Sequence, residues 1–121
     1  MSKRVTDMLP AVWAYDFTCG QPIEAMRAAF DAAGPWQWQL RDSDIYGDYL
    51  NCRPQPHVRL RVHQHAQIWY GQYPRGRDNG FLALLEAEAG SAATRPEIDA
   101  IFQRLLRAIA ATGVTEIEPY D

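Results

Sequence analysis

A strict alternation of polar and apolar residues from His57 to His65 constrains the fold more than any other stretch of this chain. Successive side chains of a β-strand point to opposite faces, so the pattern predicts a strand with two unlike faces. Val58, Leu60 and Val62 form the apolar face, which we expect to pack against a core. The other face is predicted to present a polar row, which consists of His57, Arg59, Arg61, His63 and His65 and includes all three histidines of the protein.

Two amphipathic helices are predicted, one on each side of this strand in the sequence. Pro22 suits the first turn of a helix, and apolar residues then recur at spacings of three and four until Gly34, which we expect to supply a left-handed cap. A second apolar stripe follows Thr94 and Glu97, whose spacing is that of a capping box, and this helix is expected to close before Gly113. Such stripes bury one face of a helix against a core.

Further strands are predicted from alternation and from the turn residues between them. Pro54 and Pro56 are expected to bound an irregular linker. The run from His57 to Tyr73 is long for one strand, so we expect it to divide near residues 64–66. The other strands are predicted at Ala11–Phe17, Trp36–Leu40, Ile45–Leu50, Phe81–Glu88 and Val114–Glu118.

The order of these elements predicts a single α+β domain over residues 1–121. We expect a two-layer sandwich in which two helices cover one face of a mostly antiparallel sheet, and an elaborated ferredoxin-like arrangement is one version of this plan. The other face of the sheet is expected to be uncovered. Functional groups carried by the sheet are therefore expected on that face or at its rim.

Composition and charge argue against several classes of protein. A net charge of −3 gives no general reason to bind nucleic acid, and no apolar run approaches the roughly 18–20 residues that span a membrane. Cys19 and Cys52 belong to no Cys-x-x-Cys pair, and residues 1–10 include no apolar leader, so we expect reduced thiols in the cytoplasm. The excess of arginine over lysine, with many alanines, indicates a bacterial origin.

The polar row is the first candidate site. Its arginines and histidines form a line of donors whose positive charge rises as the pH falls through the histidine range near ~6.5. A phosphate, a carboxylate ligand or an acidic protein patch is expected to suit it. The competing interpretation is a solvated sheet face on which Glu86 and Glu88 pair with these arginines across the strands.

No metal ion or cofactor is predicted. His63 and His65 would leave one face ~7 Å apart, close enough to share a zinc ion, but the sequence nominates no third ligand. Arg61 would repel a divalent cation at ~7 Å by about 5 kcal/mol at an effective dielectric of ~20. The stretch that begins at Asp42 looks like the start of a calcium loop but has Tyr46 at the fifth place and no acid at the twelfth.

Acidic and aromatic residues of the predicted hairpin over residues 36–50 form the second candidate site. Surfaces that combine acids and aromatic rings suit basic protein partners. The competing interpretation places the aromatic rings in the core. The residues concerned are Trp36, Trp38, Asp42, Asp44, Tyr46, Asp48 and Tyr49.

The leading hypothesis for function is a small non-catalytic protein-binding module, of the immunity or adaptor kind, whose partner is a protein of unknown identity. No nucleophile elbow, Walker loop or zincin motif is present, so no catalytic residues are assigned. The alternative is a small-molecule domain or enzyme that holds an anion on the polar row, with His63 or His65 as acid or base and Arg59 and Arg61 as the clamp. A third hypothesis is a homo-oligomer that pairs sheet faces or edges.

Overall fold

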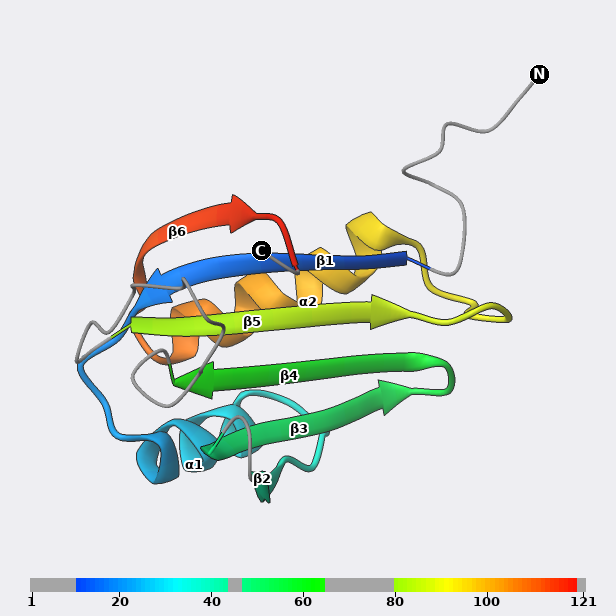
Figure 1. The fold of residues 1–121 in the computed structure, drawn as a ribbon. Helices are drawn as coiled ribbons and strands as arrows, with labels where there is room; N and C mark the ends of the chain where they lie inside the picture. The colour runs from blue at the N-terminus through cyan, green and yellow to red at the C-terminus, as the bar shows by residue number, and fades with distance from the viewer. Residues whose placement is uncertain (1–10, 44–46, 65–79, 120–121) are drawn as a thin grey trace.

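The computed structural model describes residues 11–43, 47–64 and 80–119, which form six strands and two helices (Figure 1). Both helices begin where the sequence predicts, at the residue after Pro22 and at the residue after Thr94. The elements in chain order are β1 (Ala11–Thr18), α1 (Ile23–Ala33), β2 (Gln39–Ser43), β3 (Gly47–Gln55), β4 (Val58–Gln64), β5 (Gly80–Ala87), α2 (Arg95–Ala108) and β6 (Thr112–Ile117).

The strands form one antiparallel sheet in the order β2-β3-β4-β5-β1-β6. Both helices pack on the same face of this sheet, which confirms the predicted α+β two-layer architecture (Figure 1). Strands β6, β1, β5 and β4 lie side by side as the four strands of a ferredoxin-like β-α-β-β-α-β unit do. The β2–β3 hairpin is inserted between α1 and β4 and extends the sheet at one edge.

The main core lies between the helices and the sheet face that they cover. The three apolar residues of β4 belong to it, as the alternation predicts. Phe17 of β1 stacks on Phe81 of β5 with 5.5 Å between the ring centroids, and it meets Phe102 of α2 edge-on at 6.2 Å. These rings join β1 and β5 to α2.

The sheet face away from the helices is buried along its centre. Ala14, Leu82 and Leu84 form a second buried cluster there, and Ile117 packs against it. The expectation of a wholly uncovered face is therefore wrong at β1 and β5. The physical reason is that β5 carries apolar residues on both of its faces, a pattern typical of strands that are buried on both sides.

A polar network fixes the first turn of α2 to the sheet. The predicted capping box is confirmed, with the Thr94 backbone N–H donating to Glu97 Oε1 at 2.9 Å. Two residues later, Asp99 Oδ1 accepts hydrogen bonds from Trp13 Nε1 at 2.8 Å and from the Tyr15 hydroxyl at 3.0 Å. The carboxylate thus holds the helix in register against β1.

Two predictions about the segment after α1 are wrong. Gly34 has an extended backbone with φ of −172° instead of a left-handed cap. A glycine is needed there for another reason, because the ring of Trp36 packs where a Cβ atom would lie. Residues 36–38 also precede the strand instead of forming its first half, since β2 begins at Gln39.

Strand β3 is longer than predicted, and no irregular linker follows it. The strand continues through Pro54 to Gln55, and a two-residue turn of Pro56 and His57 leads into β4, with φ of 66° at His57. Pro54 has no register partner in β2 or β4, so its missing N–H removes no ladder bond to either strand. Strand β4 is described up to Gln64, and residues 65–79, which contain the rest of the predicted division and the predicted loop, lie outside the described residues.

We expect Asp99→Ala to lower the free energy of unfolding by about 1–3 kcal/mol, because the buried Trp13 N–H would lose its acceptor. Asp99→Asn keeps an acceptor oxygen and should lose less. Urea unfolding of both variants beside the wild type measures the difference. Equal stability of Asp99→Ala and the wild type would show that this contact does not fix the helix.

Candidate functional site

The structure confirms the strand that was predicted to carry the polar row, but fewer residues of the row lie on that strand than predicted. Arg59, Arg61 and His63 lie on the β4 face away from the helices, opposite the apolar residues that enter the core. His57 is not in the strand, because it occupies the turn before it with a positive φ. His65 lies outside the described residues.

His63 is a buried, neutral residue. Its side chain is 1% exposed and stacks on the ring of Tyr49 with 4.8 Å between centroids. Burial, and then the charges of Arg61 and Arg59, lower the pKa of His63 to about 3. The expectation that this histidine gains charge as the pH falls through ~6.5 is therefore wrong, because protonation would place a cation in a desolvated site beside two arginines.

Arg59 of β4 has partners within the sheet. Arg59 Nε donates to Asn51 Oδ1 at 2.7 Å, and Arg59 faces Glu86 of β5 in the strand register. Burial and the nearby charge of Arg61 lower the pKa of Arg59. Glu88 was expected to pair with an arginine of β4. It pairs instead with Arg53 of β3, whose Nη1 lies 3.3 Å from the Glu88 carboxylate.

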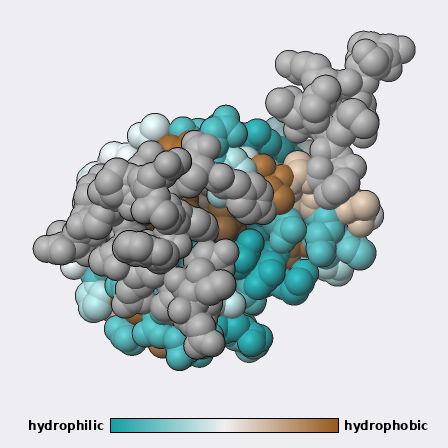
Figure 2. Space-filling view, viewed as in Figure 1, coloured by the Kyte–Doolittle hydropathy of each residue, from teal (hydrophilic) through white to brown (hydrophobic). Residues whose placement is uncertain are grey.

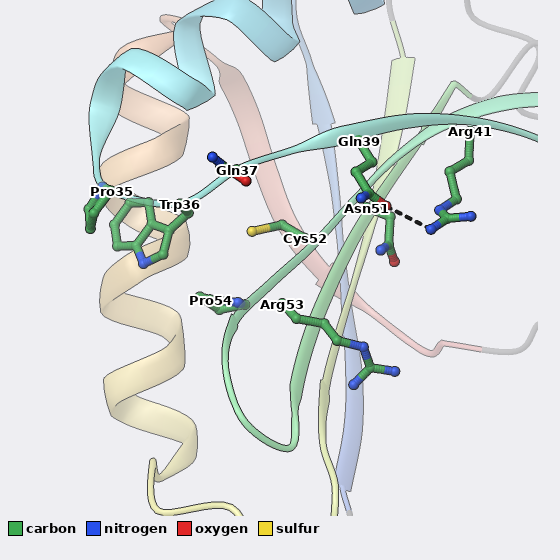
Figure 3. Close-up of a pocket in the computed structure, with 9 residues that line it drawn as sticks. All are labelled: Pro35, Trp36, Gln37, Gln39, Arg41, Asn51, Cys52, Arg53 and Pro54. Carbon is green, nitrogen blue, oxygen red and sulfur yellow. Dashed lines mark hydrogen bonds between the residues drawn. The ribbon is translucent and has the colours of Figure 1, made fainter.

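A hollow with a volume of about 430 Å³ lies beside this cluster, at the sheet edge formed by β2 and β3 (Figure 3). We call it the arginine hollow. Among the described residues, its lining contains two arginines, three side-chain amides and no carboxylate. The residues that line it are Pro35, Trp36, Gln37, Gln39, Arg41, Asn51, Cys52, Arg53 and Pro54.

The hollow exists because β2 is shorter than β3. The β2–β3 ladder starts at Gln39 opposite Asn51, whereas β3 continues to Gln55. Trp38 keeps the preceding segment away from the strand, since its backbone N–H donates to Asp31 Oδ1 at 2.9 Å. Figure 3 shows Arg41, Asn51 and Arg53 together at one end of the hollow and Trp36 at the other.

The polar groups of the hollow are positioned by neighbours. Arg41 Nη2 donates to Gln39 Oε1 at 2.7 Å. The guanidinium of Arg104, on α2, lies 5.7 Å from the centroid of the Trp36 ring, so that wall is held between helix and sheet. The Oδ1 of Asn51 accepts from Arg59, which leaves the NH₂ group of Asn51 as a donor for a ligand.

Cys52 contributes an inert thiol to this wall. Burial, and to a smaller extent the charge of Asp31, raise the pKa of Cys52 to about 11. The side chain is therefore a protonated thiol at neutral pH, and it is neither a nucleophile nor a metal ligand in that form. Within residues 11–43, 47–64 and 80–119, no three His, Cys, Asp or Glu side chains lie close enough to share a metal ion.

The described residues of the second candidate site are not gathered on one surface. Trp38 is 2% exposed and packs on Phe30 at 4.8 Å between centroids, so the structure places it in the core. Asp42 and Asp48 are register partners on the face that also carries the buried Leu50, whereas Tyr49 points to the other face. Trp36 is half-buried in the hollow, and Asp44 and Tyr46 lie outside the described residues.

The arginine hollow is not among the sites that the sequence predicts. Arg41 and Gln39 are two residues apart, as are Arg53 and Asn51, so each pair shares a face of its strand. That spacing is visible in the sequence. What brings the two pairs together is the hairpin register, which pairs Gln39 with Asn51.

No protein-family model matches the chain, and no curated protein matches its sequence. The two helices of the described residues, with 11 and 14 residues, are too short and not apolar enough for a bilayer crossing.

The neutral state of His63 predicts a pH dependence of stability. The unfolded chain binds a proton near pH 6.5, whereas the folded protein binds it only near pH 3, so the unfolded state gains protons first as the pH falls. We expect the free energy of unfolding to fall by about 1.4 kcal/mol per pH unit from this residue as the pH drops from ~6 toward ~4. Urea unfolding at several pH values measures the slope.

His63→Phe is the control for this slope. It keeps a ring on Tyr49 and removes the titrating group, so the difference between the two proteins isolates the histidine from the carboxylates that also titrate in acid. Equal slopes in the wild type and in His63→Phe would contradict the neutral assignment.

Proposed function

We propose that this protein is a non-catalytic binding protein and that the arginine hollow receives an anionic group, a carboxylate or a phosphate, of its ligand. The observation that carries the proposal is the lining, whose described residues bring two arginines and three side-chain amides, and no carboxylate, to a hollow of about 430 Å³. Ligand sites in proteins span roughly 300–1,000 Å³ and use a few convergent polar groups. In a chain with a net charge of −3, positive charge concentrated at one hollow favours an anion there.

Arginine suits this role because its planar group donates two parallel hydrogen bonds to one carboxylate or phosphate. The contact of Arg53 with Glu88 is a weak competitor. Both side chains are exposed, at 53% and 43%, and exposed ion pairs of this kind contribute only about 0–1 kcal/mol. A ligand that engages both Arg41 and Arg53 can therefore displace Glu88 at small cost.

The chemistry of the lining supports binding over catalysis. The guanidinium groups remain protonated, the amides do not exchange protons at neutral pH, and the Cys52 thiol is held protonated. These groups supply charge and donors, but none of them is a base or a nucleophile. An enzyme would need such a group from its substrate or from elsewhere in the chain.

A protein partner and a cytoplasmic location remain predictions that fit this proposal. Acidic side chains of a partner would supply carboxylates to the hollow, and Trp36, one residue of the second candidate site, forms its wall. Cys19 and Cys52 are free and buried, which supports a reducing compartment such as the bacterial cytoplasm.

We expect Arg41→Ala and Arg53→Ala each to weaken the binding of inorganic phosphate or citrate by about tenfold or more, because each removes charge-assisted hydrogen bonds of roughly 1.5–3 kcal/mol. Titrations followed by amide chemical shifts in two-dimensional NMR measure the dissociation constants and report which amides move. The amides of residues 39–41 and 51–53 should shift most.

Arg107→Ala is the matched control, since Arg107 is an exposed arginine in the last turn of α2 that does not line the hollow. It should bind like the wild type. Unchanged binding in both hollow variants would sink the proposal, and a loss confined to an Arg59→Ala/Arg61→Ala double variant would move the anion to the remaining polar row.

A further inference from the structure

Among the described residues, one stretch of β3 beside the arginine hollow has no strand paired along its β2 side. Pairing with β2 begins at Asn51, so Cys52 to Gln55 have no partner in β2. On the other side, the register with β4 shifts between Cys52 and Gln55, so Arg53 and Pro54 lie in an irregularity of that ladder. Backbone N–H and C=O groups are strong hydrogen-bonding groups, and an unpaired strand edge is a template for another strand.

The hollow keeps this edge accessible along its length. Its lining includes three consecutive residues of the open stretch, Cys52, Arg53 and Pro54, and the opposite wall is Trp36 with its neighbours. That wall is fixed, because the Trp36 ring packs against Gly34 and lies under the guanidinium of Arg104. The four residues from Cys52 to Gln55 span about 13 Å at ~3.3 Å per residue, enough to pair with three or four residues of an extended segment.

The side chains around the edge select the charge of such a segment. Arg41 and Arg53 stand at one end of the hollow, and the described residues that line it include no acid (Figure 3). Alternate residues of an extended segment point to opposite sides, so acids two residues apart would face the arginines. The residue between them would face the Trp36 and Cys52 side, where a small apolar group fits best.

We propose that the occupant of the arginine hollow is an extended acidic peptide segment of a partner protein, which adds to the open edge of β3 as a short extra strand. The proposal rests on the anion site proposed above and names its ligand class. Main-chain hydrogen bonds would supply affinity, and the arginines would supply the preference for acids at alternate positions. The hollow is lined mainly by polar side chains, so recognition here is expected to depend on charge and backbone pairing. On the face drawn in Figure 2, the described side chains are mostly hydrophilic, with hydrophobic ones near the centre.

The test uses the full-length protein and three synthetic peptides. The first is acetyl-Glu-Val-Glu-Val-Glu-amide, and the second replaces each Glu by Gln. The third repeats the first with N-methylated backbone nitrogens at its second, third and fourth residues, which removes donors from both lateral edges of the peptide. Calorimetry should show that the first peptide binds at least tenfold more tightly than inorganic phosphate or free glutamate. The glutamine peptide should lose most of this affinity, and so should the methylated one.

Two further measurements locate the peptide. Hydrogen exchange should slow at the amide of Arg53 when the first peptide is bound, and Arg53→Ala should weaken binding by about tenfold while Arg107→Ala leaves it unchanged. Equal affinity for the peptide and for phosphate would overturn the peptide proposal and leave the anion site standing, and so would equal binding of the methylated peptide. Binding of neither the peptide nor phosphate would overturn both.

Discussion

The contacts between α1 and Trp38 determine where strand β2 begins, and the candidate site depends on that position. The Trp38 backbone donates to Asp31 and accepts from Arg27 Nε at 3.0 Å, while its ring packs on Phe30. A ring of this size buries about 150–250 Å², or about 4–6 kcal/mol at ~25 cal/mol per Å². Its indole N–H has no acceptor among the described residues, a cost of about 1–3 kcal/mol, so burial wins. Extending β2 by one residue would sacrifice this packing for a ladder bond or two, and the strand therefore begins at Gln39.

The same alternation that builds the core also gathers the arginines. Leu40 and Leu50 are register partners that point toward the helices, so Arg41 is sent to the opposite face, as are the arginines of β4. The proximity of these arginines is unfavourable by itself. After burial, the charges of Arg61 and Arg53 lower the pKa of Arg59. Glu86 and Glu88 offset part of this repulsion. A positive edge in a chain of net negative charge is the arrangement that an anionic partner would relieve.

Short-range patterns predicted the elements, and long-range contacts decided the site. The capping box at Thr94 and the alternation of β4 were predictable because caps and strand faces depend on residues a few positions apart. The conformation of Gly34 was not predictable in this way. It is set by the ring of Trp36, and the sequence pattern places Trp36 in a strand. The burial of His63 was equally hidden, since the polar row shows only which side chains share a face and not what lies against that face. The arginine hollow needed the register of β2 on β3, which no local pattern specifies.

An open strand edge is a liability unless something limits what pairs with it, and the composition of this edge does so. Pro54 offers a carbonyl but no N–H, so a second strand gains fewer bonds here than along a complete ladder. A second copy of the chain docked edge to edge would bring Arg41 and Arg53 against the same arginines, and like charges across a strand pair are destabilising. An acidic strand also lacks a bond at Pro54, but it avoids the charge repulsion. Its carboxylates replace that repulsion with charge-assisted hydrogen bonds. The arginines that make the site attractive to an acidic segment therefore also make it unattractive to the protein itself.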